Sequence, residues 1–132
     1  MSARILIIED SEDFVEVLTY SLKNAGYTLL IAKNGQEGLE KARKEQPDLI
    51  LTDLMLPKMS GYEICTMLKQ DVRYRKIPIF VLSATKVQEK DEKLAKECGA
   101  NEYILKTIEP KQLLDKIREA LAAAGQVQQT PS

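Results

Sequence analysis

The sequence contains no histidine and no tryptophan, and it has only two cysteines, Cys65 and Cys98, among 132 residues. Without histidine, the chain lacks the commonest general base and cannot build a Ser-His or Cys-His nucleophile pair. A zinc site is not expected, because such sites rely on cysteine and histidine and these two cysteines lack a Cys-x-x-Cys spacing. We interpret both cysteines as reduced, structural thiols.

Long apolar runs and an excess of charge of one sign are also missing. The apolar runs, such as Ile5–Ile8 and Ile77–Leu82, are far shorter than the ~20 residues that cross a bilayer. No apolar signal region precedes the first strand-like segment. The net charge is −1, with both signs interspersed, so the chain offers no broad basic field to attract nucleic acid. We therefore expect a cytoplasmic protein that binds neither membranes nor nucleic acid directly.

The size of the chain and its 44% hydrophobic and 30% charged residues are typical of one folded domain. Apolar, strand-like segments alternate five times with segments of helical periodicity. The predicted strands are 4–8, 28–32, 48–52, 77–82 and 102–105, and the predicted helices are about 12–25, 35–45, 61–70, 87–98 and 110–124.

The strand segments lack polar alternation, which indicates strands buried on both faces of a parallel sheet. Five such strand–helix units predict a doubly wound α/β fold, a five-stranded parallel sheet covered by helices. The predicted domain spans 1–124. Residues 125–132 are polar, and we expect them to form a flexible C-terminal tail or the start of a linker.

Polar residues follow several of the predicted strands directly. Glu9 and Asp10 come after the first strand, Asp53 after the third, Ser83 ends the fourth and Lys106 follows the fifth. In open α/β sheets, ligands bind outside the carboxyl ends of the strands. If the first and third strands are neighbours, the three carboxylates lie in one crevice.

Three neighbouring carboxylates repel one another, by about 1 kcal/mol for a pair 4 Å apart in water and more in a protein. A cation would offset that repulsion, and oxygen ligands without histidine or cysteine suit Mg²⁺. A carboxylate can also act as a nucleophile and form an aspartyl phosphate. Lys106 and Ser83 would then supply a positive charge and a hydroxyl donor to the phosphoryl oxygens.

From about residue 3 to residue 124, the chain resembles the response-regulator receiver family of two-component signalling. The stretch from Asp53 through Pro57 to Gly61 is typical of that family. The resemblance implies a flavodoxin-like (βα)5 fold with strand order 2-1-3-4-5. It also implies a metal site of Glu9, Asp10, Asp53 and the backbone carbonyl of Met55, with Asp53 as phosphoacceptor and with phosphate-sensing and switch residues Ser83, Tyr103 and Lys106.

By the same resemblance, Asp53 takes a phosphoryl group, with Mg²⁺, from the phosphohistidine of a sensor kinase or phosphotransfer protein. The chain would be a phosphorylation-switched signalling domain and not an enzyme with an external substrate. The expected partners include an output domain or effector protein. A homodimer through the fourth helix, fifth strand and fifth helix is a further expectation.

Two positions depart from the family pattern. Thr107 stands where the family has proline after the lysine, so we predict a trans peptide bond there, because a cis bond before a residue other than proline costs ~2.5–4 kcal/mol. The stretch from Ser83 to Gly99 is about one residue longer than is typical of the family. Both departures touch loops near the switch residues and leave the acidic residues intact.

Three other functions compete with this interpretation. A flavodoxin-type cofactor binder needs hydrogen-bond donors in its first loop, whereas residues 9–13 carry four acids that would repel a phosphate. A phosphatase with an aspartate nucleophile would have an Asp-x-Asp motif after a strand, and none is found. A receiver-like interaction module that is never phosphorylated remains open at this point.

Overall fold

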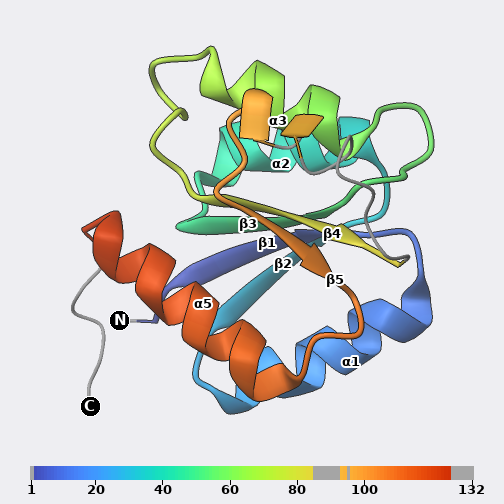
Figure 1. The fold of residues 1–132 in the computed structure, drawn as a ribbon, viewed down its shortest axis with the longest axis vertical. Coiled ribbons are helices and arrows are strands. Elements are labelled where there is room, and N and C mark those ends of the chain that lie inside the picture. The colour runs from blue at the N-terminus through green and yellow to red at the C-terminus, as the bar shows by residue number, and fades with distance from the viewer. Residues whose placement is uncertain (1, 85–92, 95, 126–132) are drawn as a thin grey trace.

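The computed structural model describes residues 2–84, 93–94 and 96–125, and Figure 1 shows strands alternating with helices along the chain. The named elements are β1 Arg4–Ile8, α1 Glu12–Asn24, β2 Thr28–Ala32, α2 Gly35–Glu45, β3 Leu49–Asp53, α3 Gly61–Lys69, β4 Ile79–Ser83, β5 Glu102–Leu105 and α5 Pro110–Ala123. Of the predicted helix 87–98, residues 93–94 and 96–97 are helical, and residues 85–92 and 95 lie outside the described part of the chain. The predicted tail beyond Gly125 also lies outside it.

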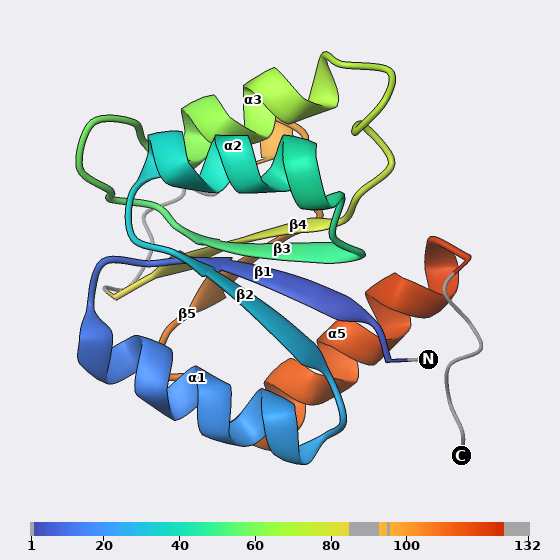
Figure 2. The ribbon, with the colours of Figure 1, turned by 180° about the vertical axis from the view of Figure 1, so that it is seen from behind.

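All strand pairings are parallel and the order is β2-β1-β3-β4-β5, so the predicted fold is confirmed. Helices α1 and α5 cover one face of the sheet, and α2 and α3 cover the other (Figures 1 and 2). Strand β1 pairs with β2 on one side and with β3 on the other. The chain therefore changes direction along the sheet beside β1 and β3, where doubly wound folds form their ligand crevice.

Two strands begin later than predicted. Strand β3 starts at Leu49, because the Asp48 carboxylate turns back to accept a hydrogen bond from the backbone N–H of Arg4, at 2.8 Å. Strand β4 starts at Ile79, because the N–H of Ile77 closes a turn onto the carbonyl of Tyr74 and Pro78 has no N–H to donate. One of these hydrogen bonds reaches β1 and the other closes a turn before β4, and a hydrophobic pattern alone indicates neither.

The core forms two layers, one on each face of the sheet. Side chains of β1, β3 and β4 alternate between them, and nearly all are fully buried. The layer under α1 and α5 includes Leu18, Leu22 and Ile117, and the layer under α2 and α3 includes Ile64 and Cys65. Burial on both faces explains the unbroken apolar runs of the strands.

Side-chain caps fix where the helices start at the carboxyl edge. Ser11 and Asn34 cap α1 and α2, and Ser60 forms a capping box with Glu63 at the start of α3. Just after Ser60, a Cβ on Gly61 would lie 2.5 Å from the carbonyl oxygen of Asp53. Only glycine fits there, so α3 begins in direct contact with the end of β3.

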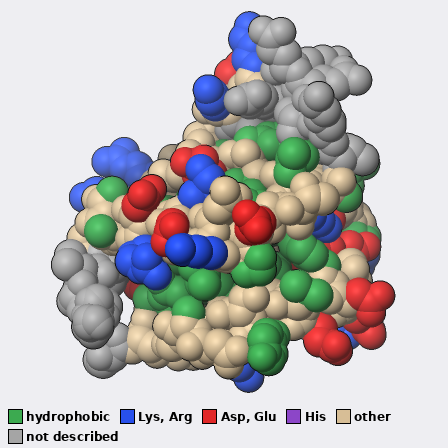
Figure 3. All heavy atoms as spheres, turned by 60° about the horizontal axis from the view of Figure 1, so that its bottom comes forward, with side chains coloured by type: hydrophobic (Ala, Val, Ile, Leu, Met, Phe, Trp, Pro, Cys, Tyr) green, Lys and Arg blue, Asp and Glu red, His purple; other side chains and the backbone are tan. Residues whose placement is uncertain are grey.

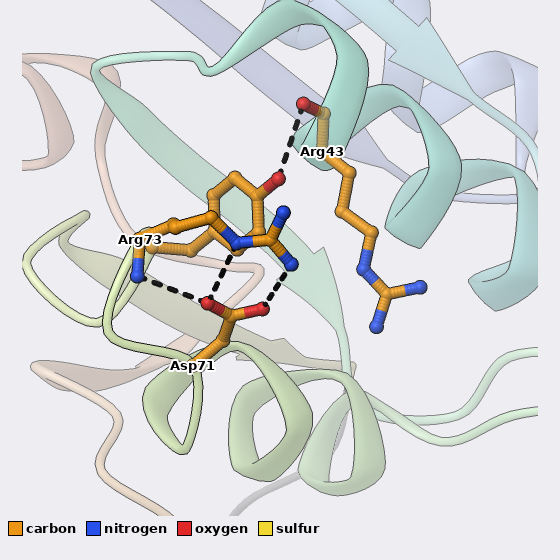
Figure 4. A network of polar contacts seen from close by, with 4 residues as sticks. Arg43, Asp71 and Arg73 are labelled. Carbon is orange, nitrogen blue, oxygen red and sulfur yellow. Dashed lines mark hydrogen bonds and ion pairs between the residues drawn. The ribbon is translucent and has the colours of Figure 1, made fainter.

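A polar network holds the opposite edge of the sheet. The Tyr74 hydroxyl donates to the carbonyl of Arg43 at the end of α2, over 3.4 Å (Figure 4). Arg73 binds the Asp71 carboxylate through both Nε and an Nη nitrogen and lies over the Tyr74 ring. The connection between α3 and β4 is thereby fastened to α2. Among the described residues, no helix is long and apolar enough to cross a membrane.

Candidate functional site at the carboxyl edge of the sheet

Three carboxylates meet where β1 and β3 end. Glu9 follows β1, and its N–H donates to the carbonyl of Ala32 on β2 at 2.9 Å, while Asp53 is the last residue of β3. Glu9, Asp10 and Asp53 each offer a carboxylate oxygen, and these oxygens lie within 4.8 Å of one another. Glu9 is 1% exposed and Asp53 7% exposed, whereas Asp10 is open to solvent. The structure thus brings together the three acids that the sequence predicted.

One lysine serves both buried carboxylates. Lys106 Nζ lies 2.7 Å from Glu9 Oε1 and 3.4 Å from Asp53 Oδ2. The backbone N–H of Lys106 donates to the carbonyl of Ser83 at 2.8 Å, and Nζ lies 4.7 Å from the centre of the Phe14 ring. Contacts from two strands and a helix therefore hold the ammonium group among the acids.

The balance of charge at this site is unfavourable despite Lys106. Burial raises the pKa of Glu9, Lys106 and the N–H of Ser11 oppose that shift, and the Asp53 charge adds to it. Burial also raises the pKa of Asp53, against Lys106 and the backbone N–H groups of Met55 and Leu54. Both carboxylates thus have a pKa above the ordinary value, which means that the folded protein disfavours their charged forms.

The donor set fits a hard divalent cation. Glu9 Oε1 lies beside Lys106 as an ion pair but has no hydrogen-bond partner of good geometry among the described residues. Buried polar atoms left in this way are costly, and a cation among the three carboxylates would satisfy the oxygen. All the ligands are oxygens and the chain has no histidine, so Mg²⁺ suits the site better than zinc or copper.

Of the remaining predicted residues, Ser83 and Met55 lie at the same edge, whereas Tyr103 lies beside Val81, in the middle of β4. Ser83 is buried at the end of β4, the strand next to β3, and Tyr103 is partly buried in β5. Met55 follows Asp53 by two positions, and its side chain is 76% exposed. Only the backbone of Met55 is thus available to the site, and its carbonyl as a metal ligand stays a prediction. The same holds for the switch roles of Ser83 and Tyr103.

The connection after β5 matches the prediction for Thr107. The Lys106–Thr107 peptide bond is trans, and the N–H of Ile108 closes the turn onto the carbonyl of Leu105 at 3.0 Å. Lys106 still reaches Asp53 without a proline after it. Threonine at this position is therefore compatible with the usual place of the lysine in the site.

Two hollows flank α1. A pocket of about 300 Å³ beside the carboxylates is lined by Glu9, Asp10, Glu12, Val15, Glu16, Thr19, Ile31 and Lys33. On the other side of α1, an apolar depression lies against α5, with Phe14, Leu18 and Leu114 in its walls and Lys106 at its end. Figure 3 shows hydrophobic side chains gathered between charged ones on this side of the molecule.

Sequence reasoning missed two contacts of Lys106. It assigned Lys106 to the phosphoryl oxygens at Asp53, whereas the shortest contact of Lys106 is with Glu9, and it did not anticipate the contact with the Phe14 ring. Glu9 and Phe14 are far from Lys106 along the chain, so no spacing pattern could have indicated these contacts.

Comparison with known proteins identifies the family. The sequence profile described as "Response regulator receiver domain" matches residues 5–118. The chain belongs to the response regulator receiver domain family. The shared fold and the acidic crevice at the expected sheet edge agree with this membership.

Several members of the family are similar to the chain over most of its length. Alkaline phosphatase synthesis transcriptional regulatory protein PhoP of Bacillus subtilis is 39% identical over 92% of the chain and 49% of its own length. Protein PilH of Pseudomonas aeruginosa is 37% identical over 91% of the chain and 98% of its own length. The chain thus spans about half the length of the PhoP and MtrA relatives and nearly the whole of PilH.

Solved structures give the same answer. The signal receiver domain of a histidine kinase from Syntrophus aciditrophicus has a TM-score of 0.86 at 32% identity, over 99% of the chain and 96% of its own. The Mn²⁺-bound form of response regulator Rcp1 has a TM-score of 0.76 at 27% identity, over 98% of the chain and 99% of its own.

The raised pKa of Asp53 predicts that Asp53→Asn stabilises the metal-free protein at neutral pH, by about 1 kcal/mol, because it removes a charge that burial disfavours. Wild-type Asp53 binds its proton at a higher pH in the folded state than in the unfolded state. The advantage of the variant should therefore shrink as the pH falls through the raised pKa, and it should vanish below the ordinary value of 3.8. Urea unfolding with a chelator present, repeated across pH, measures the difference.

Asp13→Asn is the matched control, because Asp13 is an exposed acid in the first turn of α1 outside the cluster. A destabilised Asp53→Asn protein at neutral pH, or a gap that widens as the pH falls, would contradict this reading of the electrostatics.

Proposed function

We propose that the chain is a phosphorylation-switched signalling domain in which Asp53 accepts a phosphoryl group from the phosphohistidine of a sensor kinase or phosphotransfer protein. The observation that carries the proposal is the placement of a buried aspartate between Lys106 and two further carboxylates, at the edge where doubly wound sheets bind ligands. The proposed place of action is the cytoplasm.

The chemistry needs no histidine from this chain. An Asp53 carboxylate oxygen attacks the phosphorus, the new O–P bond forms, and the N–P bond of the donor breaks so that its imidazole leaves with the electron pair. Lys106 is close enough to offset charge on the transferring group, and the N–H of Met55, which already faces the Asp53 carboxylate, adds a donor. In phosphoryl transfer, positioning and electrostatics supply most of the catalysis.

Glu9, Asp10 and Asp53 would hold Mg²⁺, with the Met55 carbonyl as a further ligand. When bound, the cation offsets the repulsion between the carboxylates and the incoming phosphoryl oxygens. The solved form of Rcp1 is bound to Mn²⁺, which supports a divalent cation in a relative of this fold. Glu9 would also hold the Lys106 ammonium group, 2.7 Å away, until Asp53 is phosphorylated.

The added phosphoryl group changes the competition for Lys106. It brings nearly two negative charges and three acceptor oxygens to Asp53, and Lys106 has little distance to cover from Glu9 to meet them. Hydrogen bonds to charged groups are worth about 1.5–3 kcal/mol each, and moving a two-state equilibrium from mostly off to mostly on takes about 5.5 kcal/mol. New contacts from Lys106, Ser83 and backbone N–H groups would together reach that figure.

The proposed output is a changed protein-interaction surface across the fourth helix, β5 and α5. Tyr103 is the proposed aromatic switch on β5, where it is partly buried and so able to change its packing. PhoP is a transcriptional regulatory protein by name and is longer than this chain, which supports an output domain or effector protein as the partner here. A homodimer through the same surface is the second form that this output would take.

The acidic edge argues against the rivals from other classes. A phosphate-bearing cofactor of the flavodoxin kind would meet the acids that line the pocket beside α1. An interaction module that is never phosphorylated would not need a buried acid cluster that burial destabilises. The labelling experiment separates that last rival from the proposal.

We predict that acetyl phosphate with Mg²⁺ phosphorylates the purified chain without a kinase, because nucleophile, cation site and lysine all belong to one chain. Asp53→Asn should abolish the mass increase seen by intact mass spectrometry, and a chelator should suppress it. Lys106→Ala should weaken the change of amide shifts near Ser83 and Tyr103 more than it weakens labelling. Asp13→Asn is the matched control and should label as wild type does.

The proposal fails if Asp53→Asn labels as readily as wild type, because the phosphoacceptor then lies elsewhere. A wild-type chain that is never labelled, with folded structure intact, would favour the interaction module instead.

Binding of Mg²⁺ should depend on Asp10, the one exposed member of the cluster. We expect Asp10→Ala to weaken the affinity about tenfold or more, the usual cost of disturbing a metal site, whereas Asp13→Ala should leave it unchanged. A titration of amide shifts with Mg²⁺ measures both. Equal affinities in wild type and Asp10→Ala would show that the cation binds somewhere else.

A further inference from the structure

The two cysteines meet on the face of the sheet away from α1 and α5. Cys65 is fully buried on α3, and its thiol donates a hydrogen bond to the backbone carbonyl of Cys98 at 3.4 Å. Burial, the larger effect, and the neighbouring Cys98 thiol both raise the pKa of Cys65. Both side chains pack in the same core layer, but Cys98 is partly exposed. The pair thus combines a partly exposed cysteine with a fully buried one.

A partly buried cation, Lys69, lies beside this pair. Lys69 Nζ donates to the carbonyls of Arg75 and Ile77, at 3.0 and 2.7 Å, and to Asn101 Oδ1 at 3.4 Å. Among the described residues it forms no ion pair with a carboxylate. Interaction with both cysteines raises the pKa of Lys69 against the larger, lowering effect of burial. The Lys69 ammonium group is therefore close enough to both cysteines to interact with them.

The backbone around Cys98 is fixed against α3 and β4. Gly99 has φ +98°, and a Cβ there would lie 2.8 Å from Lys69 Cγ. The Asn101 side-chain oxygen accepts from the N–H of Ile79 at 2.9 Å, and the backbone N–H of Asn101 donates to the Ile79 carbonyl at 2.8 Å. These contacts hold residues 98–101 against α3 and β4. They thereby keep Cys98 beside Cys65.

We propose that Cys98 and Cys65 are an oxidation site, at which a hydroperoxide converts the two thiols into an intramolecular disulfide. The Cys98 thiolate attacks one oxygen of the hydroperoxide, the O–O bond breaks, and the other oxygen leaves as water or an alcohol after taking a proton. The Cys65 sulfur then attacks the resulting Cys98 sulfenic acid. The S–S bond forms, the S–O bond breaks, and the hydroxyl leaves as water with the proton of Cys65.

This order of events follows from exposure. A hydroperoxide in solvent reaches Cys98 but not Cys65, and a second protein molecule cannot reach Cys65 either. The raised pKa of Cys65 makes it a slow nucleophile, but its contact with Cys98 gives it a high effective concentration. The bridge would tie the segment before β5 to α3, beside the surface that changes on phosphorylation; this last consequence rests on the proposed function.

The test treats reduced, full-length protein with hydrogen peroxide and then maps its thiols by mass spectrometry after denaturation and alkylation. We expect both thiols to disappear together and the chain to lose the mass of two hydrogen atoms. One cross-linked peptide should join Cys65 to Cys98. In Cys65→Ala, a dimedone trap should capture sulfenic acid on Cys98. In Cys98→Ser, Cys65 should stay reduced at the same dose.

Oxidation of Cys98 alone in wild type, to a sulfinic acid or to a dimer through two Cys98 residues, would overturn the proposal, and this outcome needs no variant to fold. Oxidation of Cys65 in Cys98→Ser at the wild-type rate would overturn the assignment of Cys98 as the first site.

A second arm tests the consequence for signalling. The oxidised and reduced proteins are treated with acetyl phosphate and Mg²⁺, and the amide shifts of Gly99, Asn101 and Tyr103 are compared. We expect equal labelling of Asp53 but a loss of the shift response in the oxidised form. An unchanged response would refute the regulatory role, whereas failure to label in both forms would count against the proposed function and leave the disulfide result standing.

Discussion

The contact of Lys106 with two buried carboxylates governs the behaviour of the whole carboxyl edge. Its ammonium group lies 2.7 Å from Glu9 and 3.4 Å from Asp53, but one positive charge cannot fully offset two acids that are almost sealed from water. The folded protein consequently retains incompletely compensated negative charge at this site. Unfavourable electrostatics of this kind are typical of functional sites, where the rest of the fold supplies the stability.

The scaffold around these carboxylates is closely packed. Strands β1, β3 and β4 are buried on both faces, and side-chain caps start the helices at the same edge. A cation and a phosphoryl group would each relieve part of the repulsion, and each would change the place of Lys106. If the proposed function holds, the same imbalance would favour cation binding at this site, and it would let phosphorylation of Asp53 affect the turn after β5, where the Lys106 N–H donates to the Ser83 carbonyl.

The sequence predicted most of this structure, because strand-end positions and side-chain chemistry are local properties. Placing Glu9, Asp10, Asp53 and Lys106 at strand ends was enough to bring them together once the strand order was known. The starts of β3 and β4 were wrong by one and two residues, because the Asp48 side chain bonds to Arg4 of β1 and Ile77 closes a local turn. Periodicity reveals neither bond. The closeness of Lys106 to Glu9 and Phe14 depends on tertiary packing, as does the contact between the two cysteines.

The most direct measurement is a crystal structure of the protein with Mg²⁺ and trifluoroberyllate, a phosphoryl mimic that bonds to carboxylates. The account predicts the beryllium on an Asp53 oxygen, the cation among Glu9, Asp10 and Asp53, and Lys106 Nζ moved from Glu9 to a fluoride. An adduct on another residue would contradict the role of Asp53. An adduct on Asp53 with Lys106 still beside Glu9 Oε1 would contradict the switch.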